Sequence, residues 1–198
     1  MENDTKIYNG FPIYEVTLED DADGVFMMSI VDTPAVEHNF LKFNKHKQKV
    51  IYHFNEEKRI ITGVALRADY PILRFEDGEY FYVKFSPQEI EKMAYKFMKE
   101  KRLDSVNINH SQNEGGIFLI ESYILDSKHN IQEFKDVALG SWIVSYKVEN
   151  QLVWEAIKKG QLNGFSVEIT GILSPVKDEF KAKELNEMYN IINLIEKL

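Results

Sequence analysis

The sequence predicts a mainly β protein of the α+β class, with a mostly antiparallel β-barrel or sheet and helices packed outside it. Three observations lead to this prediction. Short runs rich in β-branched and aromatic residues alternate with turn residues, two clear helical patterns interrupt them, and strands do not alternate regularly with helices. The 198 residues, of which 44% are hydrophobic and 28% charged, are enough for one compact core.

The expected strands are spread over the first 173 residues. Their apolar and aromatic residues recur at about every second position or form short uninterrupted runs, as in half-buried and buried strands. They fall at residues 7–18, 25–31, 49–54, 59–66, 79–85, 106–110, 117–125, 140–148 and 165–173. Residues 106–111 and 117–125 are expected to pair as a hairpin centred on residues 113–115.

Two helices are expected among these strands, and a third after them. Ser86-Pro87-Gln88-Glu89 places a capping serine, a first-turn proline and a glutamate as at a helix start, and the helical spacing continues to about Lys101. Residues 150–159 form the second pattern, and residues 178–198 form a charged amphipathic one. We therefore divide the chain into a barrel domain, residues 1–175, and a C-terminal helix, residues 176–198.

Composition excludes several classes of function. A net charge of −8 argues against nucleic-acid binding, which needs a basic face, and no run approaches the roughly 20 apolar residues that span a bilayer. The sequence has no cysteine, which excludes disulfides and thiolate ligands, and its five histidines lack the spacing of a zinc site. The first residues lack the basic and apolar regions of a secretory signal, which favours an intracellular protein. From composition we expect no zinc site, no nucleic acid and no membrane partner.

His110 and Ser166 are the candidate catalytic residues. Each lies beside an expected strand, and a histidine with a serine can supply a general base and a nucleophile. Taken separately, each residue type more often has a purely structural role. The surrounding Gly164-Phe165-Ser166-Val167-Glu168 is not the Gly-x-Ser-x-Gly nucleophile elbow, because a glutamate replaces the second glycine.

A catalytic histidine is usually oriented by a third group, and two glutamates compete for this role. In the expected hairpin, Glu121 lies about one diagonal step from His110. Its rival Glu168 shares the strand face of Ser166 at a spacing of two residues. Either glutamate could instead lie on a solvated face.

Several segments together resemble the prohead (capsid-maturation) serine proteases of tailed phages, most closely the XkdF-like branch. The most specific is Trp154–Ser166, in which a helix, Lys-Lys-Gly and Gly-Phe-Ser precede a strand. The others are Met28–Val36, Tyr82–Ser86, Asn109–Ser111, Glu121–Ile124 and Gly140–Val144. His110 precedes Ser166, which is the order of this clan and the reverse of the order in α/β-hydrolases.

The resemblance implies the fold of herpesvirus assemblin, a β-barrel ringed by helices. It implies Ser166 as the nucleophile and His110 as the general base. Assemblin uses a second histidine downstream of its serine, but no histidine follows Ser166 here. An acidic residue must then complete the site, or the site is a dyad, and we select Glu121.

The resemblance also implies a serine endopeptidase of phage capsid maturation, which acts on a peptide substrate and uses no cofactor and no metal. Such enzymes cleave scaffold protein, extensions of the major capsid protein and often themselves, inside the assembling prohead in the host cytoplasm. The C-terminal helix is expected to dock on scaffold or to mediate self-association, for example as a homodimer, or simply to cover one side of the barrel. The alternative is a non-catalytic structural or scaffolding protein of the prohead, built on a protease-like domain.

Overall fold

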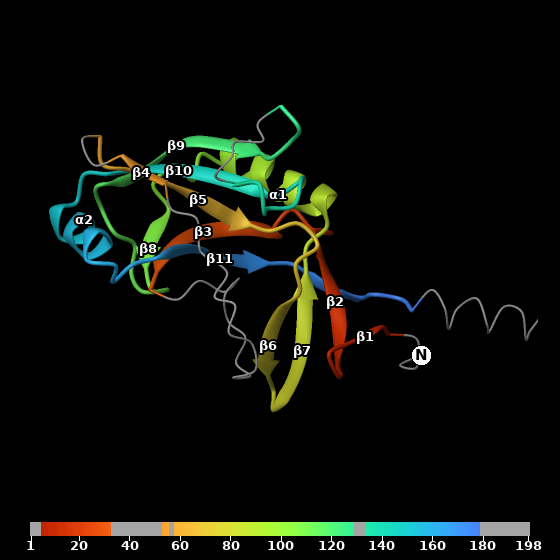
Figure 1. Cartoon of the computed structure of the whole chain (residues 1–198). Helices are drawn as coiled ribbons and strands as arrows, with labels where there is room; N and C mark the ends of the chain where they lie inside the picture. The colour runs from red at the N-terminus through yellow and green to blue at the C-terminus, as the bar shows by residue number, and fades with distance from the viewer. Residues whose placement is uncertain (1–4, 33–52, 56–57, 129–133, 179–198) are drawn as a thin grey trace, which may run out of the picture.

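The computed structural model of the chain describes residues 5–32, 53–55, 58–128 and 134–178 (Figure 1). Almost all of the expected C-terminal helix and residues 49–52 of the expected strand 49–54 lie outside these ranges. The described elements are β1 (Ile7–Tyr8), β2 (Phe11–Thr17), β3 (Gly24–Val31), β4 (His53–Asn55), β5 (Ile60–Leu66), β6 (Ile72–Glu76), β7 (Glu79–Lys84), α1 (Pro87–Lys99), β8 (Val106–Ile108), β9 (Ile117–Ile124), β10 (Trp142–Val148), α2 (Gln151–Lys158), β11 (Gly164–Thr170) and β12 (Ile172–Pro175).

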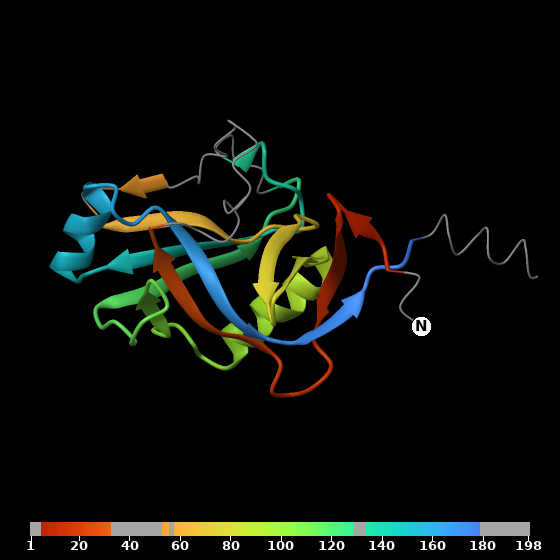
Figure 2. The same cartoon turned by 90° about the horizontal axis from the view of Figure 1, so that it is seen from below.

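The strands form three hydrogen-bonded sheets that curl into a half-barrel (Figure 1, Figure 2). Their orders are β1-β2-β7-β6 with β12 also on β2, then β4-β5-β10-β9, and β11-β3-β8. Among the described strands, pairing is antiparallel except for β2 with β7 and β3 with β8. The expected mainly β class is confirmed, but a closed barrel is not.

The three sheets share one apolar core. Met28 and Ile30 from β3, Trp142 and Tyr146 from β10, and Phe165 from β11 are almost wholly buried in it. The rings of Tyr146 and Phe165 lie 5.6 Å apart, and so join β10 to β11 across the core. Burial of such large side chains is the main stabilising term of the fold.

Helix α1 begins as its sequence predicts. The Ser86 hydroxyl accepts a hydrogen bond from the Glu89 backbone N–H, and Pro87 occupies the first turn. Phe97 lies on the apolar face of this helix, and its ring centroid is 5.5 Å from that of Trp142. Helix α2 is capped by Asn150 and covers one end of β10. No helix of the described residues is long and apolar enough to cross a membrane.

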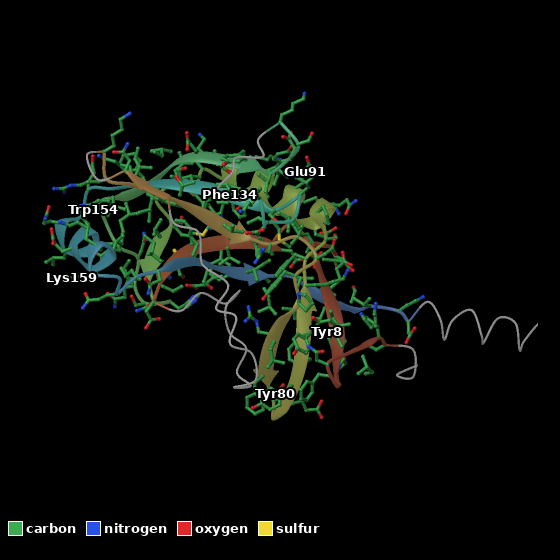
Figure 3. All side chains as sticks on the ribbon, viewed as in Figure 1. Tyr8, Tyr80, Glu91, Phe134, Trp154 and Lys159 are labelled. Atoms are coloured by element: carbon green, nitrogen blue, oxygen red, sulfur yellow. The ribbon has the colours of Figure 1, made fainter. Side chains whose placement is uncertain are left out.

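The sheet containing β6 and β7 projects from the main body and has a small core of its own (Figure 3). Ile13, Leu73 and Tyr82 are buried there. Tyr8 packs edge-on against Tyr82 with a centroid separation of 4.9 Å. After β11 the chain returns to this sheet, because β12 pairs with β2. The connection passes through Gly171, where a Cβ would come within 2.9 Å of Val16.

The turn into β10 gives a first prediction, on stability. Gly140 has φ = +87°, and a Cβ there would lie 2.6 Å from the Cβ of Pro87 in α1. We expect Gly140→Ala to lower the free energy of unfolding by about 1–3 kcal/mol, through backbone strain and overlap. Urea denaturation monitored by tryptophan fluorescence measures it. Gly115→Ala is the matched control, since no atom lies within 4 Å of its added Cβ; an equal loss in both variants would contradict the explanation.

Candidate active site

Three polar residues form a row across the sheet β11-β3-β8. Ser166 on β11 is directly opposite Ser29 on β3, and Ser29 is opposite Asn107 on β8. Cross-strand partners project to the same face, whereas the neighbouring Phe165 and Ile30 project to the other face and enter the core. Ser29 and Asn107 are fully buried, and Ser166, on the outer strand of this sheet, retains 7% exposure.

His110 reaches this row from a tight turn after β8. Asn109 and His110 both have positive φ, 49° and 56°, and the Ser111 N–H donates to the Ile108 carbonyl at 3.1 Å. The Asn109 side chain fixes the turn to the end of β3 by accepting from the Asp32 N–H at 3.0 Å. The imidazole is consequently held beside the sheet, with 46% of its side chain exposed.

Glu168 is the carboxylate that contacts His110. Its Oε1 lies 3.2 Å from His110 Nδ1 and accepts a hydrogen bond from Asn107 Nδ2 at 2.6 Å. Ser29 Oγ lies 3.1 Å from the same Nδ1 and 3.4 Å from Oε1. A carboxylate can only accept, so in the neutral imidazole it favours the tautomer with the proton on Nδ1, and Nε2 then keeps a free lone pair. Such an arrangement makes Nε2 a proton acceptor.

Glu121 lies in a different sheet. Its Oε2 accepts from Ser145 Oγ at 2.5 Å, and Ser145 Oγ lies 2.8 Å from Thr62 Oγ1. No contact among the described residues joins Glu121 to His110, so the structure does not bring our selected third residue to the other two.

The expected hairpin, on which the selection of Glu121 rested, is wrong. Strand β8 pairs in parallel with β3, and β9 pairs with β10. After His110 the chain folds back on β8 at an isolated bridge between Asn107 and Asn113, where the Glu114 N–H donates to the Val106 carbonyl and the Val106 N–H to Asn113 Oδ1, and not as a paired strand. The short apolar β8 finds its partner in a buried strand far along the chain, and this tertiary pairing overrides the local turn signal.

Sequence reasoning missed Ser29 and Asn107. Each is a polar residue between apolar neighbours in a short strand, Met28-Ser29-Ile30 and Val106-Asn107-Ile108. Buried polar groups need partners, and that requirement is the signal that could have drawn attention to both. The amide Oδ1 of Asn107 remains buried without a partner in the described structure.

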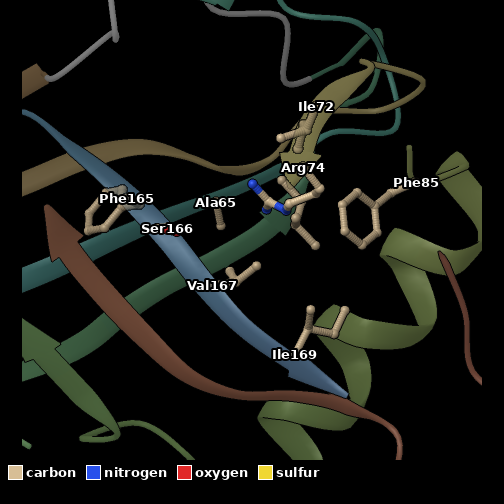
Figure 4. A pocket seen from close by; sticks show the side chains of 9 residues that line it. Ala65, Ile72, Arg74, Phe85, Phe165, Ser166, Val167 and Ile169 are labelled. Atoms are coloured by element: carbon tan, nitrogen blue, oxygen red, sulfur yellow. The ribbon is translucent and has the colours of Figure 1, made fainter. Parts of the chain in front are cut away.

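Ser166 also lines a small pocket between β11, β5 and β6 (Figure 4). No hydrogen bond of its hydroxyl, to His110 or to another group, is present in the described part of the chain. The lining residues are Ala65, Leu66, Ile72, Arg74, Phe85, Phe165, Ser166, Val167 and Ile169. The β11 side chains that enter this pocket, Phe165, Val167 and Ile169, alternate with Ser166, so the pocket lies on the face opposite to the Ser166 hydroxyl and the polar row.

Comparison with known proteins identifies a family for this chain. The profile of the family described as "Putative phage serine protease XkdF" matches residues 47–173, a span that includes His110, Ser166 and Glu168. The chain belongs to this phage protease family. "Uncharacterized protein YqbD" of Bacillus subtilis (strain 168) is 23% identical over 175 residues, which cover 85% of this chain and 51% of that protein. The chain thus spans about half the length of this relative. No solved structure matches the chain.

Proposed function

We propose that this XkdF-family chain is a serine endopeptidase in which Ser166 is the nucleophile, His110 the general base and Glu168 the residue that orients the base. The observation that carries the proposal is the 3.2 Å contact between Glu168 Oε1 and His110 Nδ1, made from the strand that also bears Ser166. Ser166 and Glu168 share one face of β11, and this shared face supports their assignment as nucleophile and orienting carboxylate.

The reaction follows from these roles. His110 Nε2 takes the Ser166 proton while Oγ attacks the carbonyl carbon of the scissile peptide bond, and the carbonyl π electrons move to oxygen. The C–N bond then breaks and His110 gives the proton to the departing amine. Water hydrolyses the acyl ester with the same histidine as base, which restores Ser166. Glu168 stabilises the imidazolium that forms twice in this cycle.

Ser29 and Asn107 hold Glu168 in place. Asn107 Nδ2 donates to Oε1, and Ser29 Oγ bridges Oε1 and the histidine. Because Ser29 is completely buried on the central strand, a polypeptide cannot reach it. We therefore assign the nucleophile to Ser166 and a supporting role to Ser29, although both hydroxyls belong to the same row.

The missing Ser166–His110 hydrogen bond defines what substrate binding must do. In free enzymes, catalytic hydrogen bonds are often long or poorly aligned and shorten when substrate binds. The His110 ring lies on a turn and is about half-exposed. We propose that the bound peptide excludes water from the ring and brings Nε2 to the Ser166 hydroxyl.

Scaffold protein and extensions of the major capsid protein are the substrates we propose, together with the chain itself. Membership of a phage protease family supports a role in capsid maturation, inside the prohead in the host cytoplasm. We also propose that the chain forms a homodimer. The alternative is a non-catalytic scaffolding protein, which the absent Ser166–His110 hydrogen bond favours.

Cleavage of the matching phage proteins tests the proposal. Wild type and Ser166→Ala are incubated separately with the scaffold and major capsid proteins, over a range of enzyme concentrations, and intact mass identifies the fragments. We expect cleavage by the wild type and none by the variant. Absence of cleavage by both, with both chains folded, would support the scaffolding alternative, and equal cleavage by both would refute Ser166 as nucleophile.

A further inference from the structure

We propose that Asn109 and Asn163 are positioning residues of this site. Both side chains bind the backbone of Asp32, and together they join the turn that carries His110 to the start of β11. The inference rests on the proposed peptidase function and adds two residues to the same site. It predicts that loss of either asparagine side chain lowers kcat, because the general base and the nucleophile are then no longer held in one geometry.

The end of β3 lies between the end of β8 and the start of β11 (Figure 1). Its last residues pair with the last residue of β8 on one side and with the first residue of β11 on the other. Asp32 is the residue that follows β3. A residue beyond the end of a strand has no partner in the sheet, so its backbone N–H and C=O need partners from elsewhere.

Side-chain amides bind both backbone groups of Asp32. Asn109 Oδ1 accepts from the Asp32 N–H at 3.0 Å, and Asn163 Nδ2 donates to the Asp32 carbonyl at 3.1 Å. The same Nδ2 donates to the Gly160 carbonyl at 3.0 Å, and the Asn163 N–H donates to the Val31 carbonyl at 2.7 Å. The two amides thus face Asp32 in opposite senses, one with its oxygen and the other with its nitrogen.

On the side of β8, this contact controls the direction of the histidine. The Asn109 N–H donates to the Ile30 carbonyl at 3.1 Å, so both the backbone and the side chain of the residue before His110 are tied to β3. Both residues of the turn have positive φ, a conformation that asparagine tolerates better than most residues. A rotation of this turn would carry the imidazole away from Glu168, whose contact with Nδ1 is 3.2 Å long.

On the side of β11, the contact holds the entry to the strand that bears the nucleophile. Asn163 directly precedes β11 and lies three positions before Ser166. The two hydrogen bonds to Asp32 therefore give base and nucleophile a common reference point at the end of β3. Because loss of either bond breaks this connection, we expect the two asparagines to act as one unit.

Steady-state kinetics of a cycle of variants test the proposal. The variants are Asn109→Gly, Asn163→Ala and the double variant; glycine keeps positive φ accessible and removes the amide. We expect each single change to lower kcat by about 10-fold with KM within about twofold, and the double variant to lose no more than the larger single loss. Asn109→Asp keeps an acceptor for the Asp32 N–H and should retain most of kcat. Losses that multiply in the double variant, or wild-type kcat in Asn109→Gly, would overturn the proposal.

Asn9→Gly is the matched control. Asn9 has φ = +46° in the turn between β1 and β2, so it undergoes the same change in nearly the same backbone conformation, but in the projecting sheet. Its kcat should stay within about twofold of wild type. A loss of kcat equal to that of Asn109→Gly would overturn the proposal, since a general loss of stability would then explain both.

A spectroscopic measurement separates this proposal from the peptidase proposal. In protein with isotope-labelled histidine, the nitrogen chemical shifts report which imidazole nitrogen carries the proton, and His110→Ala identifies the His110 signals. In mildly alkaline buffer, in which imidazole is neutral, we expect the Nδ1–H tautomer in wild type and a shift toward Nε2–H in Asn109→Gly. This shift without any cleavage by wild type would support the positioning role and refute the peptidase. An unchanged tautomer in Asn109→Gly would overturn the positioning role.

Discussion

Ser166→Ala is expected to lower kcat/KM for peptide cleavage by about 10⁴-fold or more, because it removes the only atom that forms the acyl bond. The residue is small and lies on an outer strand at 7% exposure, so loss of one hydroxyl should leave the fold intact. Initial rates on a peptide that spans a mapped cleavage site give the effect, and circular dichroism verifies the fold.

Ser29→Ala is the matched control for this result. It removes the same atom from the same row, one strand away, at a position without access to substrate. Its loss should cost about 10-fold or less, since Asn107 still donates to Glu168 and the Glu168–His110 contact does not depend on it. If Ser29→Ala abolished cleavage while Ser166→Ala remained active, the two serines would have to exchange roles.

Glu168→Gln is expected to lower kcat by about 10²–10⁴-fold with little change in KM. The amide keeps the shape of the side chain, but it cannot stabilise the imidazolium and can turn its NH₂ group toward His110. That orientation favours the histidine tautomer with its proton on Nε2. A protonated Nε2 cannot accept the proton of Ser166. Steady-state kinetics on the same peptide separate the two constants.

Glu121→Gln provides the comparison, because it makes the same chemical change in the other glutamate. Glu121 contacts Ser145 in a separate sheet, so we expect kcat within about threefold of wild type and, at most, a small loss of stability. A large loss of kcat in Glu121→Gln with normal activity in Glu168→Gln would restore Glu121 as the third catalytic residue.

Local features of the sequence were sufficient to predict most elements of the fold. The Ser86-Pro87 helix start and the Asn150 cap act within one turn, and both helices begin at the expected place. The alternation of apolar and polar residues likewise located the principal strands. Whether the sheets close into a barrel could not be predicted from such patterns, because it depends on how three sheets pack around one core.

The candidate site could be predicted only in part for the same reason. His110 and Ser166 were located by their strand ends and by family resemblance, and their catalytic roles remain predictions. The contact of His110 with Glu168 joins residues 58 positions apart, and that with Ser29 joins residues 81 positions apart. Both require the pairing of β3 with β8 and β11, whereas the hairpin that favoured Glu121 assumed pairing between neighbours in sequence.

Covalent labelling is the most direct test of the central claim, which is that His110 activates the Ser166 hydroxyl. Wild type, His110→Ala and Glu121→Gln are treated with a fluorophosphonate under the conditions in which wild type cleaves its substrate, and peptide mapping locates the adduct. We predict an adduct on Ser166 in wild type and Glu121→Gln, and its loss in folded His110→Ala. An adduct on Ser29, or labelling of Ser166 that does not depend on His110, would contradict the account.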